Sequence, residues 1–215
     1  MSQNSLRLNP PTEWFGEFNY NIHFFGLIDL INDLRKKFDI EQTLQMGSGF
    51  NKNSRFNRPY RKMIEIGSYK GESTMLFAAS GLFDEIHCID PHEGYEEAND
   101  MLSNSWDDVH SEFIKNTRPF GDMIIHHRDY SYNIVDRFGA QEFDFVYIDA
   151  AHDYESVKND ILNYKSKTNS LFGGHDYLTH PGVTAAVTDV LGTPAKHYQD
   201  GSWMIMKKRG KYYSL

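Results

Sequence analysis

Two acidic side chains and two glycines are spaced as a ligand-binding loop would need them. The segment "MIEIGSYKGEST" carries Glu65 in a short apolar run and then places Gly67 and Gly71 around a small polar loop. Further along, "EIHCID" ends on Asp90. Glycine permits sharp turns and close backbone approach to a ligand, while the two carboxylates can accept hydrogen bonds from an ammonium group and from ribose hydroxyls. The plainer alternative is a tight turn that binds nothing and an Asp90 that only ends a strand.

The loop lacks the two common phosphate-binding patterns. A dinucleotide fold would show G-x-G-x-x-G, but the spacing here is G-x-x-x-G with Glu65 just upstream. No Lys-Ser/Thr pair stands in the position that a nucleoside triphosphate requires. A ligand with a ribose and an amine but no phosphates remains, and S-adenosylmethionine has this composition.

Alternating strands and helices are needed to position these residues, and the chain shows that alternation. Short β-rich runs are separated by segments whose apolar residues recur at helical spacing, which predicts a mostly parallel sheet covered on both faces. Asp200-Gly201 between two strand-like runs predicts a two-residue hairpin turn and an antiparallel end to the sheet. Strands are expected within 62–67, 85–90, 122–129, 143–149 and 170–177, and helices within 21–40, 73–80, 105–117, 131–139, 154–165 and 182–192.

The 215 residues, 40% of them hydrophobic, predict one core. Residues 60–215 are expected to form the ligand-binding domain, and residues 1–59 an amino-terminal helical or lid segment. Within that segment Trp14, Phe15 and Tyr20 are candidates for a lid over the site, or equally for aromatic anchors to the core.

Charge and composition limit the partners. The formal net charge of -8 disfavours nucleic acid, although the basic residues of 52–62 leave a local contact to an anion open beside a solvated loop. No apolar segment suits a signal peptide or a membrane span, which predicts a cytoplasmic protein without a membrane partner. Cys88 is the single cysteine, so no intrachain disulfide can form, and we expect it to be buried. A homodimer is one open alternative for the assembly.

The motifs resemble those of the class I S-adenosylmethionine-dependent methyltransferases. "EIGSYKGEST" is similar to their first motif and "IHCIDP" to their second, and the likeness covers about residues 60 to 208. "FDFVYIDAAHDYESVKNDI", "GGHDY" and "PGVTAAVTDV" most resemble the small-molecule O-methyltransferase branch that includes macrocin O-methyltransferase and cephalosporin hydroxylase-like proteins. The resemblance implies a single-domain α/β fold, Rossmann-like, with a mostly parallel seven-stranded sheet and a carboxyl-terminal antiparallel hairpin.

The resemblance also assigns site residues one by one. Divalent metal ligands, for Mg²⁺ or Mn²⁺, would be Asp149 after the fourth strand and His175 with Asp176 after the fifth. The second acid common after the fourth strand is replaced by Ala151. The His-Asp pair makes the ligand set less oxygen-rich than Mg²⁺ prefers, and it would suit Mn²⁺ or Fe²⁺ equally. The cofactor-binding residues would be Glu65, Gly67, Ser68, Gly71, Asp90, Asp129, Tyr130, Ser131 and Asp149.

The expected reaction is methyl transfer from S-adenosylmethionine to a hydroxyl of a small-molecule acceptor. His152 or His175 would take the proton, because an imidazole titrates near working pH, and we favour His152. The alternatives are a non-catalytic binding module, which the missing acid at Ala151 favours, and a nucleic-acid methyltransferase. A third alternative is structural, because His152, Asp153, His175 and Asp176 stand where helix caps often occur. His126 and His127 receive no role, and we expect one to be buried and the other exposed.

Overall fold

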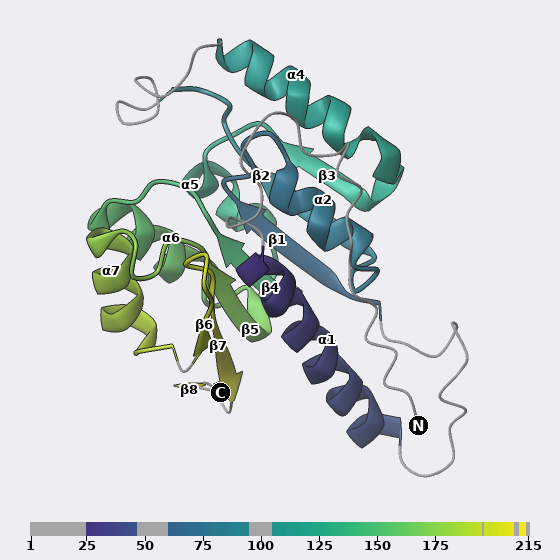
Figure 1. Ribbon diagram of the computed structural model, residues 1–215, viewed down its shortest axis with the longest axis vertical. Coiled ribbons are helices and arrows are strands. Elements are labelled where there is room, and N and C mark those ends of the chain that lie inside the picture. The colour runs from purple at the N-terminus through teal and green to yellow at the C-terminus, as the bar shows by residue number, and fades with distance from the viewer. Residues whose placement is uncertain (1–24, 47–59, 95–104, 195, 209–210, 214–215) are drawn as a thin grey trace.

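Three layers make up the fold of the described part of the chain. The computed structural model describes residues 25–46, 60–94, 105–194, 196–208 and 211–213. Helices α1, α2 and α4 cover one face of a central sheet, and α5, α6 and α7 cover the other (Figure 1). The sheet order is β3-β2-β1-β4-β5-β7-β6, with β8 paired to β7. The predicted Rossmann-like α/β fold is confirmed, and β8 is an additional short strand that the sequence did not predict.

The first five strands are parallel, so their carboxyl ends meet at one edge of the sheet. Strand β7 runs antiparallel to β5, β6 and β8. The predicted polar residues at strand ends are therefore brought to a common edge. The strands are β1 (Lys62–Ile66), β2 (Glu85–Ile89), β3 (Ile124–His127), β4 (Phe143–Ile148), β5 (Thr168–Gly174), β6 (Lys196–His197), β7 (Trp203–Lys208) and β8 (Lys211–Tyr213).

The helices begin where the sequence offers caps. The Ser105 side chain accepts from the backbone N–H of Asp108 in a capping box at α4, and Asp153 caps α6. The buried face of α4 consists of Val109, Phe113 and Thr117, while Ile114 is 46% exposed. The helical segments are α1 (Phe25–Met46), α2 (Glu72–Ala79), α4 (Trp106–Thr117), η4 (Arg118–Met123), α5 (Ser131–Ile134), η5 (Val135–Arg137), α6 (Tyr154–Tyr164) and α7 (Pro181–Leu191).

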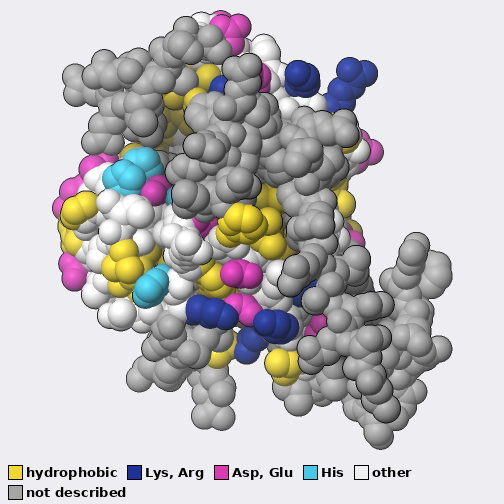
Figure 2. Space-filling model, viewed as in Figure 1, with side chains coloured by type: hydrophobic (Ala, Val, Ile, Leu, Met, Phe, Trp, Pro, Cys, Tyr) yellow, Lys and Arg dark blue, Asp and Glu magenta, His cyan; other side chains and the backbone are white. Residues whose placement is uncertain are grey.

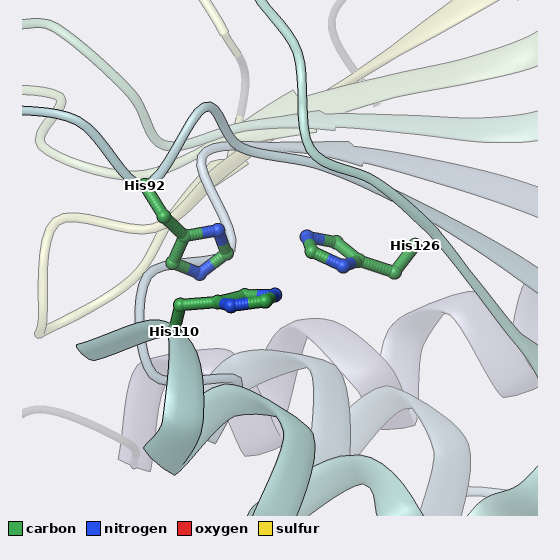
Figure 3. A group of neighbouring side chains, drawn as sticks. All are labelled: His92, His110 and His126. Carbon is green, nitrogen blue, oxygen red and sulfur yellow. The ribbon is translucent and has the colours of Figure 1, made fainter. Parts of the chain in front are cut away.

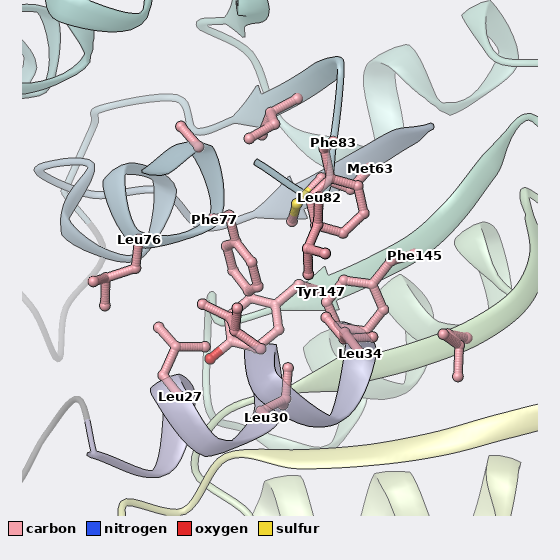
Figure 4. Close-up of a cluster of buried hydrophobic side chains, with 14 of the residues drawn as sticks. Leu27, Leu30, Leu34, Met63, Leu76, Phe77, Leu82, Phe83, Phe145 and Tyr147 are labelled. Atoms are coloured by element: carbon pink, nitrogen blue, oxygen red, sulfur yellow. The ribbon is translucent and has the colours of Figure 1, made fainter. Parts of the chain in front are cut away.

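Helix α1 packs directly on the core. Its buried stripe includes Leu27, Leu30 and Leu34, which lie against Phe77 of α2 and Tyr147 of β4 in one apolar cluster (Figure 4). The predicted stripe is confirmed at these positions. Cys88 is buried in the same cluster, as expected. Phe24, Trp14, Phe15, Tyr20 and the basic residues of 52–59 lie outside the described residues.

The hairpin between β6 and β7 is longer than predicted. His197 pairs with Trp203, so residues 198–202 form the loop, and the Tyr198 N–H donates to the Ser202 carbonyl over 2.7 Å. The predicted antiparallel pairing is confirmed, but the prediction of a two-residue turn is wrong. The Asp200 carboxylate points inward instead and accepts the Leu27 N–H of α1 over 2.6 Å. None of the helices within the described ranges has the length and apolar character that a membrane crossing requires.

Candidate functional site

The loop from β1 to α2 depends on its two glycines. Gly67 has φ +84°, and a Cβ there would lie 2.0 Å from the carbonyl oxygen of Asp149. Gly71 has φ +81° and stands at the N-cap of α2, where a Cβ would meet Thr117 at 3.0 Å. Both positions therefore require glycine for backbone reasons. The contact at Gly67 also places the end of β4 directly against this loop.

Glu65 lies beneath the loop rather than on its surface. It is fully buried, and it accepts hydrogen bonds from the hydroxyl of Ser73, over 2.5 Å, and from that of Thr74. Burial raises the pKa of Glu65 to about 7, although the two hydroxyl donors oppose the shift. A buried carboxylate that holds the first turn of α2 fixes the shape of the loop.

Asp90 and Ser68 supply polar groups beside the loop. One Asp90 carboxylate oxygen accepts the Tyr69 N–H over 2.8 Å, and the other accepts the His92 N–H over 2.7 Å. Each oxygen has a second lone pair, so the carboxylate can accept further bonds. Among the described residues, the buried Ser68 hydroxyl has no hydrogen-bond partner. Such a group is costly to bury alone, and it suits a site completed by a ligand.

The stretch after β3 also lies at this edge of the sheet. The Asp129 carboxylate accepts the Tyr130 N–H and the Asn133 side-chain amide, each over 2.8 Å. These bonds lower the pKa of Asp129. Tyr130 is exposed and stacks on Tyr132. The Ser131 hydroxyl donates to Asp160 of α6 over 2.5 Å, so its side chain is engaged with the helix layer.

A second group of polar side chains lies in the loops after β4 and β5. Three histidines there contact the carboxylate of Asp176. Its carboxylate lies 3.0 Å from His152 Nε2, 3.3 Å from His175 Nδ1 and 3.1 Å from His180 Nδ1. We call these four residues, together with Asp149, the Asp176 cluster. Asp149 Oδ1 lies 4.0 Å from His175 Nδ1. Figure 2 shows histidine and acidic side chains side by side at the surface, on the left of that view.

Charge compensation dominates the Asp176 cluster. Burial opposes the charged form of His175, but Asp149 and Asp176 outweigh it and raise its pKa to about 9. Burial likewise opposes the charged form of Asp176, and the bonds from His152 and His175 outweigh it, so the pKa of Asp176 falls. Burial raises the pKa of Asp149. His175 is therefore protonated at neutral pH in the protein as it stands.

The Asp176 cluster can serve two kinds of chemistry. One ligand atom each from Asp149, His175 and Asp176 lie within 4.8 Å of one another, as do atoms from His152, Asp176 and His180. Both sets mix oxygen and nitrogen, which suits several divalent metals. An imidazole held by a carboxylate is also the usual arrangement of a general base.

One residue of the Asp176 cluster, His180, was not predicted from the sequence. The structure also shows which residue caps helix α6. His180 stacks on His152 with ring centroids 4.2 Å apart. Its signal in the sequence was its position four residues after Asp176, just before the Pro181 that starts α7. The cap of α6 is Asp153, as the structural alternative predicted for that residue.

Backbone strain is concentrated near these groups. Five non-glycine residues of the described chain have φ between +44° and +73°; four of them, Tyr69, His92, Asp176 and Leu178, lie near these groups, and Gln141 does not. Such conformations cost of order 1–3 kcal/mol each and tend to cluster at functional sites. All four lie in loops that follow the carboxyl ends of β1, β2 and β5, so the strain falls at the same edge as the polar groups.

The expectation for His126 and His127 is wrong. Neither is exposed and neither is fully buried, because each ring packs between other rings on its own face of the sheet. His127 Nε2 lies 3.0 Å from His87 Nδ1, while His126 packs against Phe113.

Comparison with known proteins identifies the family to which the chain belongs. The family described as "Methyltransferase domain" matches residues 64–177, more than half of the chain, so the chain belongs to this family of methyltransferases. The match begins in β1 and ends just after β5, so it includes the glycine loop, Asp90 and every member of the Asp176 cluster except His180.

Several solved structures are similar to the chain at low sequence identity. The cofactor-bound Rv0187 protein from MTB is 15% identical, with a TM-score of 0.50, over 70% of this chain and 73% of that one. The O-methyltransferase from Bacillus cereus, in complex with SAH, is 15% identical with a TM-score of 0.49, over 83% and 79%. The O-methyltransferase TomG from Streptomyces achromogenes, in complex with SAM, is 15% identical with a TM-score of 0.45, over 67% and 70%. No curated protein matches the chain.

Proposed function

We propose that this protein transfers a methyl group from S-adenosylmethionine to a hydroxyl of a small molecule. The observation that carries the proposal is the buried Ser68 hydroxyl, which has no partner among the described residues and lies in the glycine loop next to Asp90. A cofactor with a ribose and an amino acid group fits acceptors and donors of this kind. The SAM and SAH complexes of the similar O-methyltransferases agree with this choice.

The cofactor would lie across the loops that follow β1, β2 and β3. Gly67, Ser68 and Gly71 shape the loop under its amino acid part, and Asp90 accepts from its ribose. Asp129, Tyr130 and Ser131 would flank the adenine. Glu65 supports the loop indirectly, because it accepts hydrogen bonds from Ser73 and Thr74 and so fixes the start of α2. Bound S-adenosylmethionine supplies a methyl group already activated on a sulfonium, so the protein contributes mainly orientation, worth roughly 7 to 11 kcal/mol in favourable cases.

His152 is the general base that the geometry favours. With its Nε2–H donating to Asp176, the neutral ring carries its lone pair on Nδ1, and the carboxylate stabilises the imidazolium that proton uptake creates. His175 is less suited, because its pKa of about 9 keeps it protonated at neutral pH. Stacking on His180 fixes the plane of the His152 ring.

A divalent ion fits between Asp149, His175 and Asp176. Two carboxylates and one imidazole within 4.8 Å form a set that Mn²⁺ accepts as readily as Mg²⁺. When bound, the ion would supply Lewis acidity to the acceptor hydroxyl. Its binding requires His175 to lose a proton, so we expect metal affinity to rise between pH 7 and pH 9.

Transfer of labelled methyl from S-adenosylmethionine to a metabolite extract tests the proposal. Methylated small molecules are expected, whereas cofactor binding without any transfer would favour the alternative of a non-catalytic binding module. Label recovered on RNA or DNA, with salt-sensitive retention, would favour a nucleic-acid methyltransferase. The same assay with EDTA, and then with Mg²⁺ or Mn²⁺ restored, tests the ion, and full activity in EDTA would exclude its role in turnover.

A further inference from the structure

Three histidines outside the Asp176 cluster face one another on the α4 side of the sheet. His92 follows β2, His110 lies on α4 and His126 lies on β3, and Figure 3 shows their rings as close neighbours, with His110 below the other two. The ring centroids are 4.9 Å apart for His92 and His110, 5.1 Å for His92 and His126, and 5.2 Å for His110 and His126. One nitrogen from each ring lies within 4.8 Å of the others.

The surroundings of His92 and His126 favour a positive charge beside one nitrogen of each ring. His92 Nε2 donates to the Tyr69 carbonyl over 2.8 Å, so the neutral ring carries its lone pair on Nδ1. Asp90 presents its carbonyl oxygen 3.2 Å and its carboxylate 3.7 Å from that Nδ1. His126 Nε2 is buried and has no hydrogen-bond partner among the residues that the structure describes. A lone pair beside two oxygens and a second, unpartnered nitrogen favour a cation at this place.

We propose that His92, His110 and His126 bind a Zn²⁺ ion that links helix α4 to the edge of the sheet. Neutral imidazole is a common zinc ligand, and three histidines leave a fourth position for water. With Zn–N distances of about 2.0–2.1 Å, ligand nitrogens in a tetrahedral site are roughly 3.3 Å apart. Because the ligand nitrogens lie within 4.8 Å of one another, the rings need to approach by at most about 1.5 Å, which rotation of side chains can provide.

The protonation of the rings agrees with this site. Burial, together with the neighbouring rings, lowers the pKa of His126 to about 4, and burial lowers that of His110. These two rings are therefore neutral at pH 7, and metal binding would displace few protons. The hydrogen bond from His92 Nε2 to the Tyr69 carbonyl is of the kind that orients the ring of a metal-binding histidine.

One cation opposes the ion. Arg128 donates to His110 Nδ1 over 3.3 Å, and it also contacts Asp107 over 3.1 Å. Zinc binding through the other nitrogen of His110 requires a proton on Nδ1, so this contact from Arg128 has to be released. The arginine is partly exposed and keeps Asp107 as a partner. Removing Arg128 should therefore tighten metal binding.

Titration of the metal-free protein with Zn²⁺, and with Co²⁺ followed by its visible absorption, tests the proposal. Wild type is expected to bind with a Co²⁺ spectrum of a tetrahedral nitrogen site, and His110→Ala should weaken binding at least tenfold, since loss of even an outer-shell partner costs 10- to 100-fold. His126→Ala should act in the same direction, and Arg128→Gln should raise the affinity. The matched control is His127→Ala, the next residue on β3, which faces the other side of the sheet.

The Asp176 cluster is a competing zinc site, and the variants separate the two. An ion held there would leave the affinity unchanged in His110→Ala, which is on α4 and can be replaced without opening the core. Equal Zn²⁺ affinity and an unchanged Co²⁺ spectrum in wild type, His110→Ala and His126→Ala would overturn the proposal. These readouts do not depend on methyl transfer, so failure of the proposed function would leave them intact.

Discussion

The glycine loop after β1 and the Asp176 cluster lie at the same edge of the sheet but are built in opposite ways. In the loop, backbone conformation decides the structure: two glycines have positive φ, and the single buried acid, Glu65, is satisfied by hydroxyl groups. In the Asp176 cluster, charge decides it, because imidazoles surround one carboxylate. The two meet where Gly67 touches the Asp149 carbonyl.

This difference indicates which property each region can change without losing its structure. A loop held by backbone geometry does not accept an added methyl group, and its one buried acid, Glu65, titrates in a pH window of its own. A cluster held by charge tolerates small changes in volume but responds to protonation. Substitutions and changes of pH should therefore affect the two regions differently.

The largest effect is expected for Gly67→Ala. The added Cβ would lie 2.0 Å from the Asp149 carbonyl oxygen at φ +84°. Left-handed strain and overpacking together should lower the free energy of unfolding by about 4 kcal/mol. Urea denaturation measures it. Gly81→Ala is the matched control, because it has φ +65° but nothing within 4 Å of its Cβ, and it should cost only about 1 kcal/mol. Equal losses in the two variants would contradict a backbone-determined loop.

The second largest effect is expected from pH, because the stability contributed by each region should be lost over a different pH range. The folded-state pKa of His175, about 9, lies above its ordinary value of 6.5. Its stabilisation is therefore complete below pH 6.5 and lost as the pH rises to 9, by up to about 3 kcal/mol. Glu65, at about 7 against an ordinary 4.5, loses its contribution between pH 4.5 and 7.

Urea denaturation between pH 4.5 and 10 tests both windows. Glu65→Gln should flatten only the lower window and His175→Gln only the upper one. A single variant that flattens both windows would show that the two regions titrate as one unit.

A smaller effect is expected on cofactor affinity for Asp90→Ala. Loss of a charged acceptor typically costs about 1.5 to 3 kcal/mol, so the affinity for S-adenosylhomocysteine should fall at least about tenfold. Calorimetry measures the affinity. Asp129→Ala, which removes a more exposed acid after the neighbouring strand, should cost less. Unchanged affinity in a folded Asp90→Ala protein would remove this residue from the site.

The smallest effect is expected for Ser68→Ala, which should raise the stability of the protein while it lowers the affinity for the cofactor. Ser68→Ala removes a buried hydroxyl without a partner among the described residues, so the free energy of unfolding should rise, by about 1 kcal/mol. Cofactor affinity should fall at the same time. Ser80→Ala is the control, because that hydroxyl donates to the Phe77 carbonyl and accepts the Leu82 N–H, and its loss should only destabilise. A Ser68→Ala protein with weaker folding and normal affinity would assign Ser68 to the structure alone.

Local patterns predicted most of the fold. The order of strands and helices, and the apolar stripe of α1, follow from short-range periodicity that packing does not overrule. The length of the last hairpin loop could not be predicted from Asp200-Gly201, because Asp200 is used by α1, 173 residues away in sequence. Short strand β8 lacks a strong pattern and depends on pairing with β7.

The candidate site was predictable where it follows strand ends and not where it depends on neighbours. Glu65, Asp90, Asp149 and Asp176 were placed by their strands alone. His180 and the group of His92, His110 and His126 come from separate elements, and only the packing of α4 and α7 brings them to their partners. A single sequence carries no signal for such convergence.

The bond from Leu27 to Asp200 has a consequence for how the chain acquires its structure. The first described helix is tied at its beginning to a turn near the end of the described chain. During synthesis, this bond can form only after Asp200 has left the ribosome, although the apolar partners of α1 in α2 and β4 emerge earlier. Contacts of such long sequence separation slow folding, because the loop must close before the contact stabilises it.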